Sequence, residues 1–124
     1  MSTEPSATQD QLERALIDMA IEGWRFARLF SRVLSKLDAG EAGRYVSQHR
    51  YFHKRLEDTL SANGLVLVNV EGQPYDAGIA ATALNLADFG PSDVLIVDQM
   101  IEPIIMGSQG LRQQGTVMLR KVEV

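Results

Sequence analysis

The chain has 124 residues, of which 45% are hydrophobic and 23% charged, and its formal net charge is −4. This length suits one domain with a modest core. The negative charge argues against a nucleic-acid or membrane-surface partner, because both are polyanionic. Without cysteine there is no disulfide, thiolate nucleophile or cysteine metal ligand, which fits a reducing compartment. No secretory leader or membrane-length apolar run is visible, so we expect a cytoplasmic protein.

The first half of the chain predicts a long amphipathic helix after a flexible tail at residues 1–8. Ser6 or Thr8 is positioned to cap this helix, and Gly40 to end it in the left-handed conformation. Apolar residues recur in alternating steps of four and three, at Leu12, Leu16, Met19, Gly23, Phe26, Phe30, Val33 and Leu37, with Ala20, Ala27 and Leu34 widening this face. Such a wide apolar face is typical of a helical bundle.

A second helix is expected from about Glu41 to the stop at Asn63-Gly64, with one face formed by Tyr45, His49, Phe52, Leu56 and Leu60. The short connection predicts an antiparallel helical hairpin over residues 9–63. A hairpin alone leaves much apolar surface exposed, so we expect two copies to form a dimeric four-helix bundle; the alternative is that the rest of the chain covers this face. The expected dimerisation residues are Leu16, Met19, Phe26, Phe30, Val33, Leu37, Phe52 and Leu56. Trp24, the only tryptophan, is either a core residue of the bundle or an interface anchor.

Residues 64–124 change character and predict a small C-terminal all-β head, giving an α+β protein overall. A strand is expected at 65–70, a turn at 71–74, a strand at 93–97 and a final strand at 117–124. Between them, Asp76 caps a short helix over 77–81, or residues 83–86 form a strand. The apolar residues of the final strand change parity, which predicts a bulge near Arg120.

Few residues suggest chemistry. His49, His53 and Glu57 stand four residues apart, as metal ligands on a helix can. No second helix offers matching donors, however. The commoner interpretation is that these side chains lie at the edge of the apolar helix face and bind no metal. Basic residues at 44–55 read as a solvated helix face, and the glycines at 107, 110 and 115 lack the strand-to-helix context of a phosphate loop. We therefore expect no metal, no cofactor, no nucleic-acid binding and no enzymatic activity.

From the second helix onward the chain resembles the GrpE family, the nucleotide exchange factors of DnaK-type chaperone ATPases. Residues 56–65 (LEDTLSANGL) resemble the end of that family's last helix, and 72–76 (GQPYD) resemble its Gly-x-x-Phe-Asp-Pro. Residues 80–83 (AATA) stand in place of its His-Glu-Ala-Val. Residues 96–103 (IVDQMIEP) resemble the strand before its Pro-Gly-Tyr turn, and 118–120 (MLR) its closing strand. Ile104-Ile105 replaces Gly-Tyr and Lys121 replaces a proline, as in a short, divergent member.

The resemblance implies a homodimeric co-chaperone whose β head enters the ATPase domain of a DnaK-type chaperone and promotes ADP release, without a catalytic side chain. The contact residues it suggests are Tyr75, Arg112, Gln113 and Arg120 in the head, with Arg44 and Arg55 in the hairpin. The competing interpretation is a small dimeric adaptor or assembly protein whose β head binds another protein without exchange activity.

Overall fold

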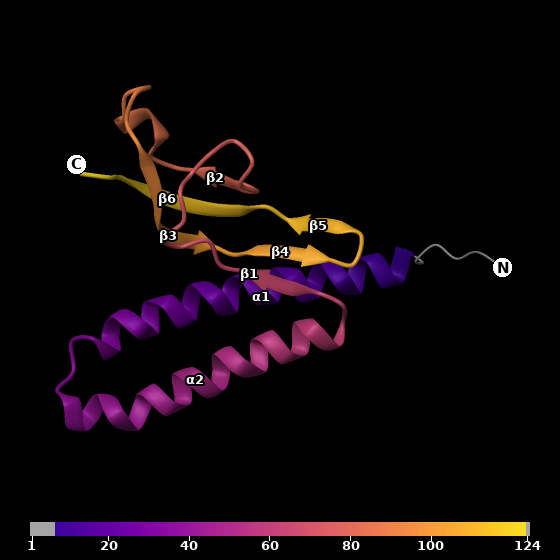
Figure 1. Ribbon diagram of the computed structural model, residues 1–124. Helices are drawn as coiled ribbons and strands as arrows, with labels where there is room; N and C mark the ends of the chain where they lie inside the picture. Colours follow the sequence, from indigo (N-terminus) through magenta and orange to yellow (C-terminus); the bar gives the residue numbers. More distant parts are fainter. Residues whose placement is uncertain (1–6, 124) are drawn as a thin grey trace. The chain divides into compact units, whose positions relative to one another are not determined.

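The computed structural model describes residues 7–123, and these divide after Leu60 into two compact units. The first unit holds the helices α1 (Ala7–Leu34) and α2 (Ala39–Ala62), which fold back on each other (Figure 1). The second unit, called the β head below, contains six short strands. The predicted α+β class with an N-terminal helical hairpin is confirmed.

The two helices are joined at a point that differs from the prediction. Helix α1 ends at Leu34, and Asp38 caps α2, since its Oδ1 accepts the backbone N–H of Glu41 at 2.9 Å. Gly40 therefore lies in the first turn of α2 and does not end α1 with a positive φ. Thr8 lies inside α1 and is not its cap, while Ser6 falls outside the described residues. An Asp that accepts an N–H three residues ahead is a strong helix start, and this signal outweighed the glycine.

The end of α2 follows the prediction. Gly64 has φ +74° and donates its N–H to the carbonyl oxygen of Ser61 at 3.0 Å, so it terminates the helix in the conformation that glycine adopts most easily.

Contacts between α1 and α2 run in antiparallel order. A Cβ placed on Gly23 would lie 3.2 Å from Cζ of Phe52, the Trp24 and His53 rings lie 5.8 Å apart, and His49 reaches Ala27 further along α1. Gly23 thus permits a close approach of Phe52. The buried side chains of α1 are Ile17, Ala20, Ile21, Trp24, Ala27 and Leu34, so Trp24 is a buried residue.

The β head contains two three-stranded sheets. One sheet has the order β1 (Val66–Val68), β4 (Ile104–Gly107), β5 (Gly110–Gln113), with antiparallel pairs. The other has the order β2 (Ala81–Ala83), β6 (Gly115–Lys121), β3 (Leu95–Glu102), in which β2 is parallel to β6. The chain passes from β3 to β4 at the buried Pro103, which has no N–H to place in a ladder.

Two local predictions in the β head were wrong. Asp76 does not start a helix over 77–81: its Oδ1 accepts the N–H of Gly78 at 2.7 Å, which makes a turn before β2. Residues 83–86 do not form a strand of their own either, because β2 ends at Ala83 and a short 3-10 helix, Leu86–Asp88, follows.

The irregularity predicted near Arg120 lies instead in the partner strand. Val97 pairs with Leu119 and Gln99 with Met118, so Asp98 is the extra residue on β3. A second shift follows between Met100 and Glu102.

The core of the β head is aliphatic. Its fully buried side chains are those of Val97, Met100, Pro103, Ile105 and Val117. No helix within residues 7–123 combines the length and the apolar character needed to cross a membrane.

Candidate protein-binding surfaces

A row of large apolar side chains lies exposed along α1. Leu12, Met19, Phe26 and Val33 stand exactly seven residues apart and are 66%, 69%, 65% and 48% exposed, with Leu29 beside them. These five residues are called the outer stripe below. Two exposed residues of α2, Tyr45 and Phe52, also stand seven apart. Exposed apolar surface of this extent is unusual for a monomer and is typical of an interaction site.

Three of the predicted dimerisation residues belong to this outer stripe, and the other five, among them Phe52 of α2, lie elsewhere on the hairpin. Met19, Phe26, Val33 and Phe52 are exposed, whereas Leu16, Phe30, Leu37 and Leu56 are half-buried. Phe30 stacks on His49 with ring centroids 6.1 Å apart, and Leu56 lies near Gly23. The four-three spacing therefore marks two neighbouring rows: Gly23 and Phe30 of one row contact α2, and the exposed residues of the other form the outer stripe.

In the β head, three segments that carry the family resemblance lie side by side. Residues 72–76 run along β3: the N–H of Gly72 reaches the carbonyl oxygen of Val97 at 2.8 Å, and Pro74 bridges to Ile96. Ile96 in turn pairs with Arg120 on β6. Pro74, Ile96 and Arg120 thus form one transverse row across neighbouring segments of the sheet, and this row is called the Arg120 row.

Arg120 is an exposed side chain whose Nε lies 3.4 Å from Oδ1 of Asp98. An exposed ion pair of this kind contributes about 0–1 kcal/mol, so the arginine is available to a partner at small cost. Tyr75 is half-buried, and its N–H is bonded to the carbonyl oxygen of Leu95, which pairs with Lys121. Tyr75 therefore lies in the row next to the Arg120 row. Because side chains alternate between the faces of a sheet, this neighbouring row belongs to the opposite face.

The remaining suggested contact residues, like Tyr75, lie outside the Arg120 row. Arg112 and Gln113 lie on β5 in the other sheet, where Arg112 passes over Gly107. Arg44 and Arg55 are exposed on α2, eleven residues apart and hence on the same side of the helix. The exposed Tyr51 stands between them on that side, a residue that sequence reasoning missed.

Sequence reasoning also missed the exposed apolar residues of the described β head, which are Leu84, Leu86 and Val94 between strands, with Val66 on β1 and Leu111 on β5. The segment that carries the first two is fixed by Asn85, whose side-chain amide donates to the carbonyl oxygen of Leu119 and accepts from its N–H, both at 2.9 Å. The apolar-polar alternation of residues 83–86 could have indicated these exposed leucines, but it was interpreted only as a possible strand.

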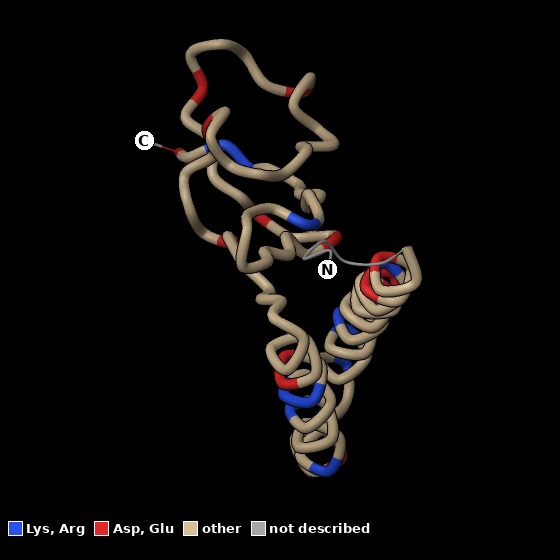
Figure 2. Tube along the Cα trace, turned by 90° about the vertical axis from the view of Figure 1, so that its right-hand side faces the viewer, with Lys and Arg blue, Asp and Glu red and all other residues tan. Residues whose placement is uncertain are grey.

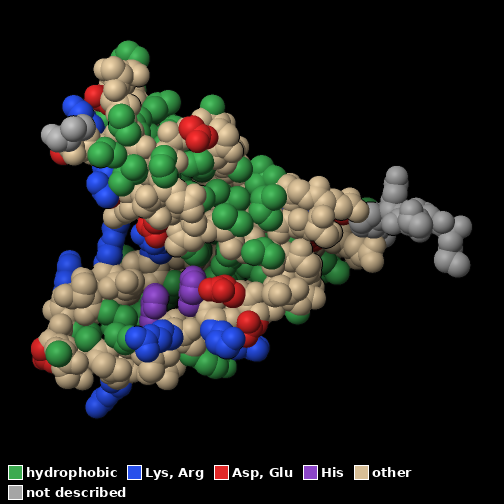
Figure 3. Space-filling model, viewed as in Figure 1, with side chains coloured by type: hydrophobic (Ala, Val, Ile, Leu, Met, Phe, Trp, Pro, Cys, Tyr) green, Lys and Arg blue, Asp and Glu red, His purple; other side chains and the backbone are tan. Residues whose placement is uncertain are grey.

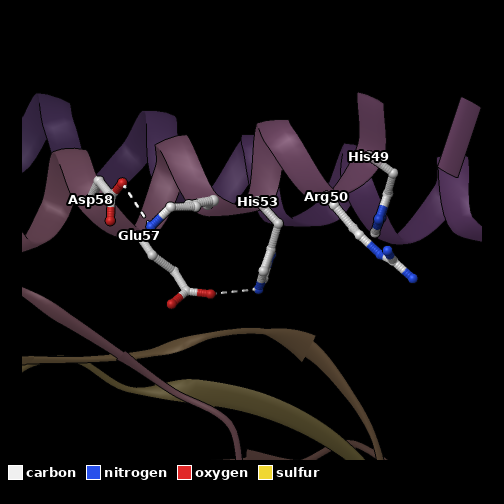
Figure 4. Close-up of a pocket in the computed structure, with 6 residues that line it drawn as sticks. His49, Arg50, His53, Glu57 and Asp58 are labelled. Atoms are coloured by element: carbon white, nitrogen blue, oxygen red, sulfur yellow. Dashed lines mark ion pairs between the residues drawn. The ribbon is translucent and has the colours of Figure 1, made fainter. Parts of the chain in front are cut away.

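The histidines lie on a polar face of α2, shown in Figure 3 among acidic and basic side chains. A hollow on this face is lined by His49, Arg50, His53, Lys54, Glu57 and Asp58 (Figure 4). His49 Nε2 lies 3.0 Å from the carbonyl oxygen of Ala27 and must donate, because a carbonyl only accepts. His53 Nε2 lies 2.9 Å from Oε1 of Glu57.

Both histidines are thus engaged within the hairpin, one with α1 and one with its own helix. Within residues 7–123, no three His, Cys, Asp or Glu side chains are grouped so as to hold a metal ion. The lining of the hollow carries matched charges, since Lys54 Nζ also lies 3.4 Å from Oδ2 of Asp58. This face is best described as a set of ion pairs along one helix.

Comparison with known proteins found no matching family model, no matching curated protein and no matching solved structure. The resemblance to the GrpE family therefore depends on the residues quoted above.

Proposed function

We propose that this chain is a GrpE-like co-chaperone, a homodimeric nucleotide exchange factor that promotes ADP release from the ATPase domain of a DnaK-type chaperone. The observation that carries the proposal is the Arg120 row. Residues 72–76, β3 and β6 come from three separate parts of the sequence, and each contains a segment that resembles the family. Each motif is weak in the sequence, but the three segments are adjacent and together form one surface.

Exchange of this kind needs no catalytic side chain. A factor that binds the open, nucleotide-free conformation of the ATPase more tightly than the closed one shifts the population toward the open form. The coupling is reciprocal, so ADP must weaken binding of the factor by the same ratio by which the factor weakens binding of ADP. The β head acts as a rigid wedge in this proposal, and the hairpin provides the dimer.

The structure offers a matched pair of variants to test the contact surface. Arg120 and Lys121 are adjacent on β6, so their side chains point to opposite faces of the sheet. Each is exposed and each lies 3.4 Å from an aspartate, Arg120 from Asp98 and Lys121 from Asp93. Arg120→Glu and Lys121→Glu therefore make the same charge change and break a similar surface pair, but on different faces.

The experiment measures release of a fluorescent ADP analogue from a DnaK-type ATPase of the same genome, by stopped flow. We expect Arg120→Glu to raise the concentration of factor needed for half-maximal release at least tenfold, and Lys121→Glu to change it less than threefold. Equal effects of the two variants would contradict the assignment of the Arg120 row. Light scattering and circular dichroism confirm that both variants keep the assembly and fold of the parent.

A second candidate function is favoured by Leu84, Leu86 and Val94, whose exposure fits a protein-binding surface outside the Arg120 row. In an adaptor of this kind the β head binds a protein partner and leaves nucleotide release unchanged. Binding to the ATPase without any acceleration of ADP release at saturation would favour the adaptor over the exchange factor.

A further inference from the structure

The link between the hairpin and the β head contains the sequence Asn63-Gly64, the one place in the chain where glycine directly follows asparagine. Both residues are exposed, and they lie between α2, which ends at Ala62, and β1, which begins at Val66. No charged residue occurs from 59 to 70, and the tube is tan along this stretch (Figure 2).

The residue that follows an asparagine controls how reactive its side chain is. Asparagine is thermolabile because the backbone nitrogen of the next residue can attack the carbon of the side-chain amide. Glycine hinders this attack least, since it has no Cβ and lets other atoms come close to its backbone. The other two asparagines, Asn69 and Asn85, are followed by valine and leucine, whose side chains crowd the nitrogen. The sequence thus makes Asn63 the most reactive of the three.

The fold holds the other two asparagines in hydrogen bonds that oppose the reaction. Asn69 Oδ1 accepts the backbone N–H of Glu71 at 2.9 Å. The half-buried Asn85 side chain accepts the N–H of Leu119 and donates to its carbonyl oxygen, both at 2.9 Å. Rotation of either amide toward the next backbone nitrogen breaks these bonds.

The surroundings of Asn63 are more permissive. This residue stands directly after the last residue of α2, and helix ends fray. The nitrogen that must react, that of Gly64, donates its N–H to the carbonyl oxygen of Ser61 at 3.0 Å. This single turn bond at the helix end has to open before the nitrogen can attack, and its opening requires no change in the core of the β head.

We propose that Asn63 is a site of spontaneous deamidation in the folded protein. A base removes the amide proton of Gly64, and the nitrogen then bonds to Cγ of Asn63. The Cγ–Nδ2 bond breaks, and the leaving nitrogen takes up a proton and departs as ammonia, which leaves a cyclic imide. Water adds to either carbonyl carbon of the imide and opens the ring. Opening at Cγ gives aspartate, and opening at the backbone carbonyl carbon gives isoaspartate.

Either product changes the link chemically. Both add a negative charge directly after α2, where the helix dipole disfavours an anion, and the last turn of α2 has no basic residue to compensate it. Isoaspartate also lengthens the backbone by one methylene group. Leu60 and Leu65, on either side of the link, are 0% and 2% exposed, so residues 61–64 must absorb this extra length. We therefore expect the aged protein to melt at a lower temperature than the fresh protein.

The experiment incubates the whole protein in mildly alkaline buffer at physiological temperature and follows each asparagine by fragmentation mass spectrometry. We expect Asn63 to convert at least tenfold faster than Asn69 or Asn85, at a rate that rises with pH because the attacking nitrogen must lose its proton. An isoaspartate-specific methyltransferase should label the aged protein. Asn63→Gln should abolish this label, since the longer side chain must close a larger ring, whereas the matched control Asn69→Gln should retain it.

Two results would overturn the inference. One is an intact Asn63 in the folded protein, with rapid conversion of the same residue in guanidinium, which would show that the hydrogen bond from Gly64 to Ser61 protects the site. The other is conversion of all three asparagines at the same rate. Melting curves establish that both glutamine variants are folded. The inference does not depend on the proposed function, and the ADP-release assay on fresh parent protein tests that function separately.

Discussion

Gly115, the first residue of β6, has no room for a side chain. Its N–H donates to the carbonyl oxygen of Ala80 at 3.0 Å, and a Cβ built on it would lie 2.8 Å from Cγ1 of Ile104, 3.0 Å from the carbonyl oxygen of Glu102 and 3.2 Å from Cε of Met100. Two of these neighbours belong to buried side chains and one is backbone, so none can rotate away into solvent. We predict that Gly115→Ala destabilises the β head although it adds a single methyl group.

The expected magnitude follows from the cost of overpacking a core, about 1–3 kcal/mol. With a carbonyl oxygen among the contacts we take about 2 kcal/mol, which lowers the melting temperature of a domain of this size by roughly 8–16 °C. Gly107→Ala is the control. Its Cβ would also lie 2.8 Å from a neighbour, but that neighbour is Cγ of the exposed Arg112, which can move into solvent. We expect the control to lower the melting temperature by less than half as much.

Thermal unfolding followed by circular dichroism at 218 nm (roughly the β signal) and by calorimetry measures both variants. A melting temperature of Gly115→Ala within experimental error of the parent would refute the reasoning, because the space around residue 115 would then have to be larger than the described contacts allow. A loss as large in Gly107→Ala would refute the distinction between buried and solvent-exposed neighbours.

Three further predictions concern single residues. Gly43→Ala should stabilise α2 by about 1 kcal/mol, since its Cβ meets nothing within 4 Å. Gly23→Ala should stabilise the protein less, because its Cβ crowds Phe52 of the facing helix. Urea unfolding that shows the larger gain in stability for Gly23→Ala would contradict this packing. Asn85→Ala should cost about 1–3 kcal/mol in urea unfolding, because it leaves the backbone N–H and carbonyl of Leu119 without their partner, and an unchanged midpoint would contradict the role of the amide. The pKa of Asp93 is lowered, chiefly by the hydrogen bond from the backbone N–H of Gly90 and also by Lys121. The stabilising contribution of Asp93 is therefore complete above its unfolded pKa of about 4. It is lost as the pH falls through the lower folded pKa. Asp93→Asn should therefore lower the melting temperature at pH 7 and lose this effect at acid pH, and an effect that grows on acidification would be contrary to the assigned shift.

The helical hairpin could be predicted from sequence because its signals are local. The four-three spacing from Leu12 to Leu37 and the stop at Gly64 each depend on a few neighbouring residues. The end of α1 was misplaced, because Gly40 was taken as its end, whereas Asp38 caps α2 through its hydrogen bond from the N–H of Glu41.

The β head was harder to predict because its strands are short and their pairing is non-local. β2 has three residues and is parallel to β6, more than thirty residues later, and no local pattern announces such a partner. The bulge shows the same difficulty: the parity change on the final strand was visible, but the extra residue is Asp98, on the opposite strand.

The candidate surfaces also differ in how far they could be predicted from the sequence. Four residues of the outer stripe, Leu12, Met19, Phe26 and Val33, follow from helical periodicity and were named from the sequence, whereas Leu29 was not. The separation of Arg120 from Arg112 and Gln113 depends on which strands belong to which sheet, and Tyr51 was missed because a single aromatic residue on a polar helix face gives no periodic signal.

The central claim is that this protein accelerates nucleotide release from a DnaK-type ATPase, and one measurement tests it most directly. A fluorescent ADP analogue is loaded on the ATPase of the same genome, excess unlabelled nucleotide is added, and the release rate is followed by stopped flow as the concentration of this protein is raised. The account predicts a release rate that rises at least tenfold and saturates, with the protein itself releasing no phosphate from ATP. A release rate that stays at its basal value when binding of the two proteins is saturated would contradict it.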